Sequence, residues 1–262
     1  MGDPAMRPAI AFVTLAAVSA LAWPATATAA TGERTTRISM CRRYQHLDVD
    51  DRYTVYNDTF GSPGQCLVNR NRWANFQVTA SKASTRSPET QAFPDIFYGC
   101  SRGWCSPGTT LPMRISALKS PEASWYNHDQ AGGRWNTAFD LWFSRSRQTS
   151  GQPNGAELMI WLNERSFQLP TRDHGRYVRI EGTSWYFDHW RPCRQGACWN
   201  YVRFWRLRTV WHVHNLRLAP FIQAAERAGL IKRSWWLETI SAGYELWRNG
   251  RGLATTRFSA RA

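Results

Sequence analysis

The chain has 262 residues, which is enough for one large all-β domain or for two smaller ones. Its formal net charge is +14, but the basic residues are scattered, which is typical of a solvated basic surface and gives no reason to expect a specific nucleic-acid partner. Fifteen tryptophans are an excess that, in an exported protein, suggests stacking on sugars.

Residues 1–30 have the pattern of a secretory signal peptide. Arg7 supplies the positive start, residues 9–23 form an uncharged apolar run, and Ala27-Thr28-Ala29 fits the small-residue cleavage rule. The run is shorter than the roughly 20 residues that a membrane span needs. The protein is therefore predicted to be secreted, with cleavage near Ala29/Ala30, and not to be held in a membrane.

The six cysteines are expected to form disulfides, because export places them in an oxidising compartment. Two pairs each enclose four residues and would staple local loops, which leaves one pair to tie the N-terminal segment to the first loop. The pairs are Cys100 with Cys105, Cys193 with Cys198, and Cys41 with Cys66. A four-cysteine zinc site is the alternative, but secretion argues against it, and none of the six histidines has metal-ligand spacing with a carboxylate. No metal or cofactor is expected.

Alternating, aromatic-rich segments separated by turn signals predict strands along most of the chain. In order they cover residues 52–57, 73–80, 111–117, 137–144, 156–162, 177–190, 200–214, 234–247 and 252–259, with a strand end and a stapled loop at 93–108. Only residues 218–229 predict a helix, with Phe221, Ala224, Ala225 and Ala228 on its inner stripe and Gly229 ending it. This pattern predicts an all-β fold over residues 31–262, a single β-sandwich or jelly roll.

The strand at 156–162 is unusual on one of its faces. Alternation puts three aliphatic residues on one side, and Glu157, Met159 and Trp161 on the other. A carboxylate beside a methionine and a tryptophan suits the floor of a sugar-binding cleft, where an aromatic plane stacks on a pyranose. The alternative is an edge-strand glutamate over a half-buried aromatic pair.

Two other strands repeat the arrangement. Glu245 shares a non-core face with Trp247, and Asp140 shares one with Trp142. If these strands lie side by side with the strand of Glu157, the three acids converge. Glycoside hydrolysis uses two carboxyl groups that flank a bond, one to donate a proton and one to attack or to activate water. Three unrelated surface acids are the alternative.

The segments GAELMIWL, ISAGYELWRNGRGL, AFDLWF, YTVYNDTFG and FYGCSRGWCSPGTTLPMRIS together resemble secreted endoglucanases of glycoside hydrolase family 12, in order over residues 41–258. The resemblance implies a compact jelly roll of two antiparallel sheets with one helix on the convex face. It implies Glu157 as nucleophile, Glu245 as acid/base and Asp140 as the carboxylate that supports the nucleophile. Met159 would lie beneath the reacting sugar, and Trp161 would help to shape the cleft. The disulfides Cys41–Cys66 and Cys100–Cys105 are implied as well.

The chain departs from the family pattern at three points. The family commonly has Asn-Asn-x-Trp-Gly where residues 57–61 read Asn-Asp-Thr-Phe-Gly, so Phe60 replaces a tryptophan that stacks on a remote sugar. Asn57 is kept and is a candidate contact for a sugar hydroxyl. The loop of Cys193 and Cys198 is extra, and so is the strong basic charge. These departures bear on substrate preference more than on catalysis.

The sequence thus predicts a retaining endo-β-1,4-glucanase that cleaves internal bonds of cellulose or related β-glucans by double displacement. Its partner would be the polysaccharide substrate, and the protein is expected to be a monomer. The alternatives are a xyloglucan-specific endoglucanase, a non-catalytic polysaccharide or cell-wall-binding protein on the same fold, and a wall protein that binds polyanions through its charge.

Overall fold

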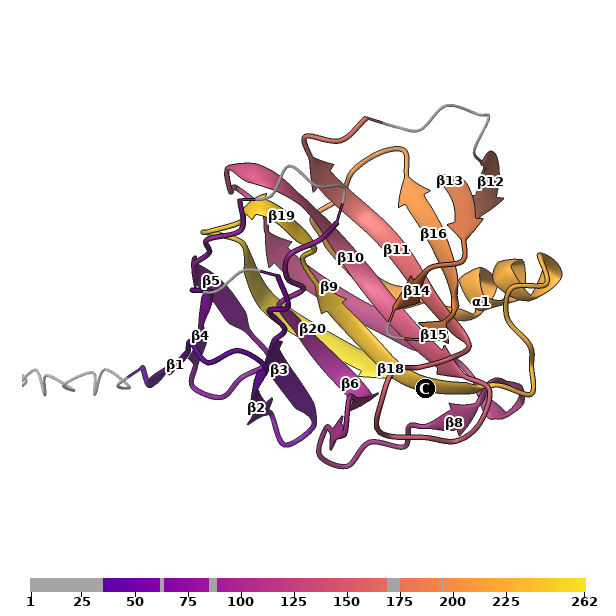
Figure 1. Cartoon of the computed structure of the whole chain (residues 1–262), viewed down its shortest axis with the longest axis horizontal. Coiled ribbons are helices and arrows are strands. Elements are labelled where there is room, and N and C mark those ends of the chain that lie inside the picture. Colours follow the sequence, from indigo (N-terminus) through magenta and orange to yellow (C-terminus); the bar gives the residue numbers. More distant parts are fainter. Residues whose placement is uncertain (1–34, 62–63, 85–88, 169–174, 195) are drawn as a thin grey trace, which may run out of the picture. The chain divides into compact units, whose positions relative to one another are not determined.

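The computed structural model describes residues 35–262, apart from residues 62–63, 85–88, 169–174 and 195. The predicted signal peptide lies outside the described residues. The described part is built from a six-stranded sheet, a twelve-stranded sheet and a two-stranded hairpin (Figure 1). Over the described residues, the prediction of an all-β jelly roll with one α-helix is confirmed.

The smaller sheet is antiparallel and contains both ends of the described chain. Its strands, in spatial order, are β1 (Arg37–Met40), β4 (Cys66–Arg70), β5 (Phe76–Ala80), β20 (Ala254–Arg261), β9 (Glu122–His128) and β17 (His212–Arg217). The sequence analysis missed β1, β4 and β9, which are short or lie outside the segments with clear alternation.

The larger sheet is the one that carries the three acids. Its main path runs β12 (Arg176–Ile180), β13 (Thr183–Trp190), β16 (Asn200–Arg206), β11 (Ala156–Arg165), β10 (Gly133–Ser144), β18 (Trp236–Gly243), β6 (Asp95–Ser101), β3 (Tyr53–Asn57) and β2 (Gln45–Val49). Three short strands lie beside this path: β19 (Leu246–Asn249) on β10, β7 (Trp104–Cys105) on β6 and β8 (Met113–Arg114) on β18. All pairs are antiparallel except β11 with β16, which is parallel.

The predicted alternation along the central strands is confirmed. Leu158 and Ile160 of β11 and Phe139 of β10 are buried in the main apolar core. The opposite face of the same strands carries Glu157 and Asp140, and we call it the acid face. Because side chains of a strand alternate with a period of two, the carboxyls lie on this face as a direct consequence of packing the aliphatic residues.

Helix α1 (Ala219–Arg227) covers the face opposite the acid face. Its Phe221 packs against Trp185 of β13 and Phe204 of β16, with ring centroids 5.0 and 5.2 Å apart. Trp185 and Phe204 are each followed in their strand by a residue of the opposite, acid-bearing face. The predicted helix is confirmed, although it is one residue shorter at its start and two at its end.

Four predicted strands differ from the structure. The segment 234–247 is interrupted at Tyr244 and Glu245, between β18 and β19. The segment 177–190 is two strands, because Glu181 and Gly182 both have positive φ and form the two-residue turn that joins β12 to β13. The segment 200–214 is divided between β16 and β17, which belong to different sheets. At 111–117 only β8 is extended, and a 3₁₀-helix, Ile115–Ala117, follows it.

The three expected disulfides are all present: Cys41–Cys66, Cys100–Cys105 and Cys193–Cys198. The last one joins β14 (Cys193–Arg194) to β15 (Ala197–Cys198), and we call this element the stapled hairpin. It connects β13 to β16 along the chain and lies beyond their ends (Figure 1). No helix in the described part of the chain is long and apolar enough to cross a membrane.

Candidate active site

Strand register brings two of the three acids together. Glu157 of β11 pairs with Trp142 of β10, and Asp140 of β10 pairs with Met159 of β11. Glu157 and Asp140 are thus diagonal neighbours on one face, a relationship that places Cα atoms roughly 7–8 Å apart. On its other side Asp140 pairs with Ser241 of β18, the strand that leads to Glu245.

The carboxylate of Glu157 is oriented by an indole. Trp199, which directly follows the stapled hairpin, donates a hydrogen bond from Nε1 to Oε2 of Glu157 over 2.7 Å. The Trp199 ring packs against that of Trp142, with centroids 5.6 Å apart. Burial, and then the charge of Glu245, raises the pKa of Glu157 to about 8, although the Trp199 hydrogen bond acts in the opposite direction.

Asp140 is held by the second indole of the same pair. Trp142 donates from Nε1 to Oδ2 of Asp140 over 2.7 Å, while Oδ1 is buried without a partner. Only 4 % of Asp140 is exposed. Burial, followed by the charge of Glu157, raises the pKa of Asp140 well above its ordinary value. Burial and the nearby charge of Glu157 therefore both favour the protonated form of Asp140.

Glu245 lies in the break between β18 and β19, not within a strand. Asn136 of β10 binds it twice through its side chain: Oδ1 accepts from the Glu245 backbone N–H at 3.0 Å, and Nδ2 donates to Oε2. Thr90 donates from its hydroxyl to Oε1 over 3.1 Å. Burial raises the pKa of Glu245 to about 7, and the two hydrogen bonds, with the charge of Arg203, limit the rise.

The two glutamates therefore retain a proton into the neutral range. Both pKa values are raised chiefly by burial, which disfavours the charged form of each carboxyl. Since the groups interact, the proton belongs to the pair, and removing the charge from one makes the other easier to ionise. One protonated and one ionised carboxyl is the state that an acid and a nucleophile need when they act together.

An aromatic cluster forms the floor around these acids. Its buried members are Phe93, Ala138, Met159, Trp161, Tyr186, Tyr201, Trp205 and Trp247, with Phe60, Phe167 and Leu207 packed against them. The hydroxyl of Tyr201 contacts the Met159 sulfur at 3.0 Å. Trp161 is only 2 % exposed, so it supports the floor from within and does not offer a free face for stacking.

Comparison with known proteins identifies the family. A sequence model of glycosyl hydrolase family 12 matches residues 52–262. The chain belongs to glycosyl hydrolase family 12. Among curated proteins it is 29% identical over 156 residues to "Probable cellulase Cel12b" of Mycobacterium tuberculosis, covering 59% of this chain and 98% of the relative. It is 31% identical over 96 residues to "Endoglucanase S" of Pectobacterium parmentieri, covering 36% of each protein.

Solved structures agree with this assignment. A metagenome-derived family 12 endoglucanase is 34% identical with a TM-score of 0.78, over 87% of this chain and 98% of that one. Endoglucanase Cel12A from Rhodothermus marinus is 32% identical with a TM-score of 0.78, over 85% and 97%. A family 12 xyloglucanase from Bacillus licheniformis, 19% identical with a TM-score of 0.76 over 86% and 98%, shows the same fold. The protein is thus a glycoside hydrolase whose relatives are cellulases and endoglucanases.

The structure corrects the expectation for Asn57. Its side chain is fully buried and is used inside the protein: Nδ2 donates to the carbonyl oxygens of Met40 and Arg42, and Oδ1 accepts from Gln65 at 2.8 Å. A sugar hydroxyl cannot reach it in this position. In this family 12 enzyme, Asn57 ties the end of β3 to the N-terminal segment, next to the Cys41–Cys66 disulfide.

Phe60 lies at the edge of the aromatic floor. It is partly exposed and packs against the cluster that contains Met159 and Trp161. Its backbone N–H bonds to the carbonyl of Gln91, so the segment around Phe60 runs beside the segment around Thr90. This places Phe60 where a contact with a sugar is sterically open, and the stacking role stays a prediction.

Several residues that shape the site were missed by the sequence analysis. They are Asn136 and Thr90, which bind Glu245; Trp199, which binds Glu157; and the buried ion pair of Arg203 with Asp188. Arg203 lies over the rings of Trp161, Trp205 and Trp190 at 4.7, 5.2 and 5.4 Å. In the sequence, Trp199 simply follows a cysteine and Asn136 simply precedes a predicted strand. Only the fold reveals what they contact.

Two further buried acids extend the site toward β3. Asp58 and Asp95 are 8 % and 5 % exposed, and burial raises the pKa of both, to about 6 for Asp58. The charge of Asp58 adds to the rise for Asp95, and Arg102 opposes both. Asp58 occupies the second asparagine position of the family motif, a difference visible in the sequence.

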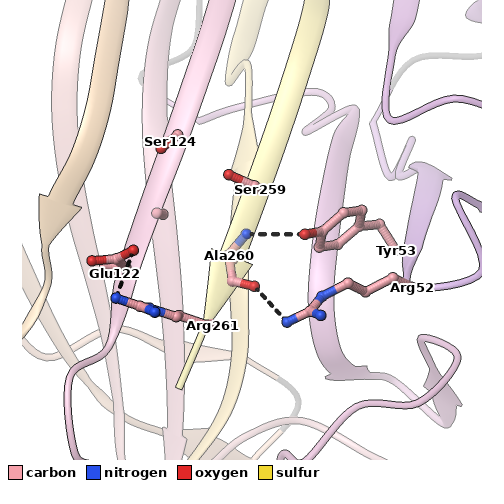
Figure 2. Close-up of a pocket in the computed structure, with 8 residues that line it drawn as sticks. Arg52, Tyr53, Glu122, Ser124, Ser259, Ala260 and Arg261 are labelled. Atoms are coloured by element: carbon pink, nitrogen blue, oxygen red, sulfur yellow. Dashed lines mark hydrogen bonds and ion pairs between the residues drawn. The ribbon is translucent and has the colours of Figure 1, made fainter.

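The hollow of about 160 Å³ in Figure 2 is separate from the acid face. It is lined by residues of β9 and β20 in the smaller sheet and by Arg52 and Tyr53. Its charged groups already have partners: Arg261 pairs with Glu122 at 3.0 Å, and Arg52 donates to the carbonyl of Ala260. It offers no group suited to hydrolysis. Across the described residues, no three His, Cys, Asp or Glu side chains are grouped so that they could hold a metal ion.

Proposed function

We propose that the protein is a secreted, retaining endo-β-1,4-glucanase that cleaves internal bonds of cellulose or related β-glucans. The observation that carries this proposal is the pairing of two buried carboxyls with distinct hydrogen-bond partners on one sheet face. Glu157 lies on a rigid central strand beside Asp140, whereas Glu245 lies in a strand break and binds Asn136 and Thr90. The expected disulfides suit an oxidising, extracellular compartment.

In the first step, the pair reacts in the state that has its shared proton on Glu245, and the ionised Glu157 oxygen attacks the anomeric carbon. Glu245 transfers its proton to the glycosidic oxygen, the bond to the leaving chain breaks, and a glycosyl ester of Glu157 forms. Esterification removes the negative charge of Glu157 and so lowers the pKa of Glu245. Glu245, which has just given up its proton, therefore stays ionised. Trp199 orients the Glu157 carboxylate for the attack by donating to its Oε2, and Asp140 lies beside Glu157 as its diagonal neighbour on the sheet.

In the second step, Glu245 acts as a base. It takes a proton from a water molecule, the water oxygen attacks the anomeric carbon, and the ester bond to Glu157 breaks. Two inversions give net retention of configuration. The proton returned to Glu245 restores the starting state, so no cofactor enters the cycle.

A direct test combines product stereochemistry with variants of the two glutamates. The first product released from cello-oligosaccharides should be the β-anomer by proton NMR, and an α-anomer would assign Glu157 another role. Glu157→Gln and Glu245→Gln should each lower kcat on cellulose-derived polymers by at least about 10³-fold. Glu226→Gln on helix α1, on the opposite side of the sheet, is the matched control and should retain activity.

Reducing-sugar release should be measured on carboxymethylcellulose, mixed-linkage glucan, xyloglucan and xylan. Binding of these polymers without turnover by the unaltered protein would favour the non-catalytic alternative. Binding that falls steeply with salt and does not change in Glu157→Gln would favour a polyanion-binding role instead.

A further inference from the structure

The stapled hairpin makes contact with a segment that is distant in sequence. A nitrogen of the Arg194 guanidinium lies 3.9 Å from the carboxylate of Glu89. The same guanidinium lies 5.8 Å from the centre of the Phe60 ring. The hairpin emerges between β13 and β16, whereas Phe60 follows β3 and Glu89 precedes β6. Arg194 therefore joins parts that lie on opposite sides of the central acid-bearing strands in the sheet order.

The partner segment is anchored beside Glu245. The carbonyl of Gln91 accepts hydrogen bonds from the backbone N–H groups of Phe60 and Gly61, and its own N–H donates to the carbonyl of Leu246 at 2.8 Å. Ala92 forms bridges to both Thr59 and Leu246. These bonds combine residues 59–61 and 89–92 into one wall, which we call the Phe60 wall.

Each side of the contact also binds one catalytic carboxyl. Trp199, one residue past the staple, donates to Glu157, and Thr90, next to Glu89, donates to Glu245. The Arg194–Glu89 contact thus connects the element that orients Glu157 to the wall that orients Glu245. The charge of Arg194 also acts on Glu157 and opposes the rise in its pKa, which agrees with a position close to the reacting groups.

We propose that Arg194 is a specificity-determining residue: together with the Phe60 wall, the stapled hairpin forms a bridge across the acid face that accepts unbranched glucan chains and disfavours chains bearing sugar branches near the cleaved bond. This inference rests on the proposed glucanase function and adds a substrate class to it. An unbranched chain needs only the width of one sugar, whereas each branch adds bulk at the level of the bridge.

The bridge is weak enough to open for a polymer. An ion pair between exposed side chains is screened by water and salt and contributes little to stability.

 Solvent reaches both groups, with side-chain exposures of 54% for Arg194 and 72% for Glu89. Entry of an unbranched chain can therefore displace the contact at little cost, while the disulfide Cys193–Cys198 keeps the hairpin itself in place.

The test compares Arg194→Ala with Arg191→Ala. Arg191 lies at the base of the same hairpin and bonds to Asn200 at 3.0 Å, so it controls for loss of a hairpin arginine without loss of the bridge. Initial rates are measured on mixed-linkage glucan (linear, neutral), carboxymethylcellulose (linear, anionic) and xyloglucan (branched, neutral). For Arg194→Ala the ratio of kcat/KM on xyloglucan to kcat/KM on mixed-linkage glucan should rise about tenfold. Arg191→Ala should leave the ratio unchanged.

Two results would overturn the inference. One is an unchanged ratio in Arg194→Ala; the other is a loss confined to carboxymethylcellulose, which would make Arg194 a contact for anionic groups. Binding separates this question from turnover. In a Glu157→Gln background, Arg194→Ala should lower the ratio of the Kd for a branched xyloglucan oligosaccharide to the Kd for an unbranched cello-oligosaccharide, as measured by calorimetry. A wild-type protein that binds but never cleaves would refute the glucanase proposal, while the ratio of Kd values would still decide the role of Arg194.

Discussion

The two glutamates that we propose to be catalytic are held by regions of opposite character. Glu157 is part of the continuous strand β11, which is paired with β10 from Ala156 to Arg165 and with β16 from Ala156 to Trp161. Glu245 lies between β18 and β19, where the ladder is interrupted, and Asn136 replaces part of the missing backbone pairing. A nucleophile must approach one carbon along one line, and a central strand fixes its position. A group that gives and takes a proton benefits from side-chain partners that bind it in both states.

Asn136→Ala, on the Glu245 side of this comparison, is expected to have the largest effect on catalysis. It removes the donor to the Glu245 carboxylate and the acceptor for the Glu245 N–H together. Bonds to charged groups contribute about 1.5–3 kcal/mol, so kcat should fall roughly 10- to 100-fold. The hydrogen bond from Asn136 lowers the pKa of Glu245, so its loss should move the basic limb of kcat/KM to higher pH.

Asn163→Ala is the matched control for that variant. Asn163 lies on neighbouring β11, is similarly buried and bonds to Asp129 instead of to a catalytic acid. It should reduce the free energy of unfolding without moving the basic limb. If both variants move the limb equally, Asn136 acts through general stability and not through Glu245.

A smaller effect is expected on the rigid side, from Trp199→Phe. The variant keeps a ring against Trp142 but removes the N–H that donates to Glu157. One lost hydrogen bond to a charged acceptor should lower kcat about tenfold. Because that bond favours the ionised form, the pKa of Glu157 should rise, and the acid limb of the pH profile should move upward.

Trp142→Phe provides the comparison, since it removes the equivalent N–H from Asp140. Its effect on the acid limb should be weaker, because Asp140 affects Glu157 only indirectly. Equal shifts in the two variants would show that the indole pair acts as one packing unit.

The smallest effect on catalysis is expected from Asp58→Asn, which should act on stability. Burial raises the folded-state pKa of Asp58 from 3.8 to about 6, so ionising it opposes folding above that pH. This increase in pKa corresponds to a folding penalty of roughly 3 kcal/mol at most. The penalty is absent near pH 3 and fully present by pH 8 in the natural protein. Urea unfolding should therefore show Asp58→Asn to be more stable at pH 8 and not at pH 3, whereas the exposed Asp51→Asn should change little at either pH.

Much of the acid face could be predicted from the sequence, because alternation with a period of two is a local property. Packing Leu158 and Ile160 inward forces Glu157 outward whatever the neighbouring strands are. The strands at 177–190 and 200–214 could not be divided by the same test. Their continuity in hydrophobic pattern hides a two-residue turn in the first and a change of sheet in the second.

Residues that act through a partner were beyond sequence reasoning. Asn57 matched a family motif, yet its side chain is turned into the protein, since β3 ends against the N-terminal segment and leaves its amide facing backbone carbonyls. Thr90 and Glu245 are 155 positions apart, and no periodicity relates them. The bonds around Glu245 depend on where a loop crosses the sheet, which only the assembled fold determines.

The parallel pairing of β11 with β16 has a consequence for how the molecule folds. Ala156 pairs with Asn200, and every later pair keeps that separation, so this edge of β11 stays unpaired until β16, which follows β12, β13 and the stapled hairpin in the chain, has joined it. Contacts this distant along the chain form slowly, because the entropy of closing the intervening loop is lost before the strands gain any stability from pairing. The strand that presents Glu157 therefore depends on a pairing that is slower to form than its pairing with β10, the strand just before it along the chain.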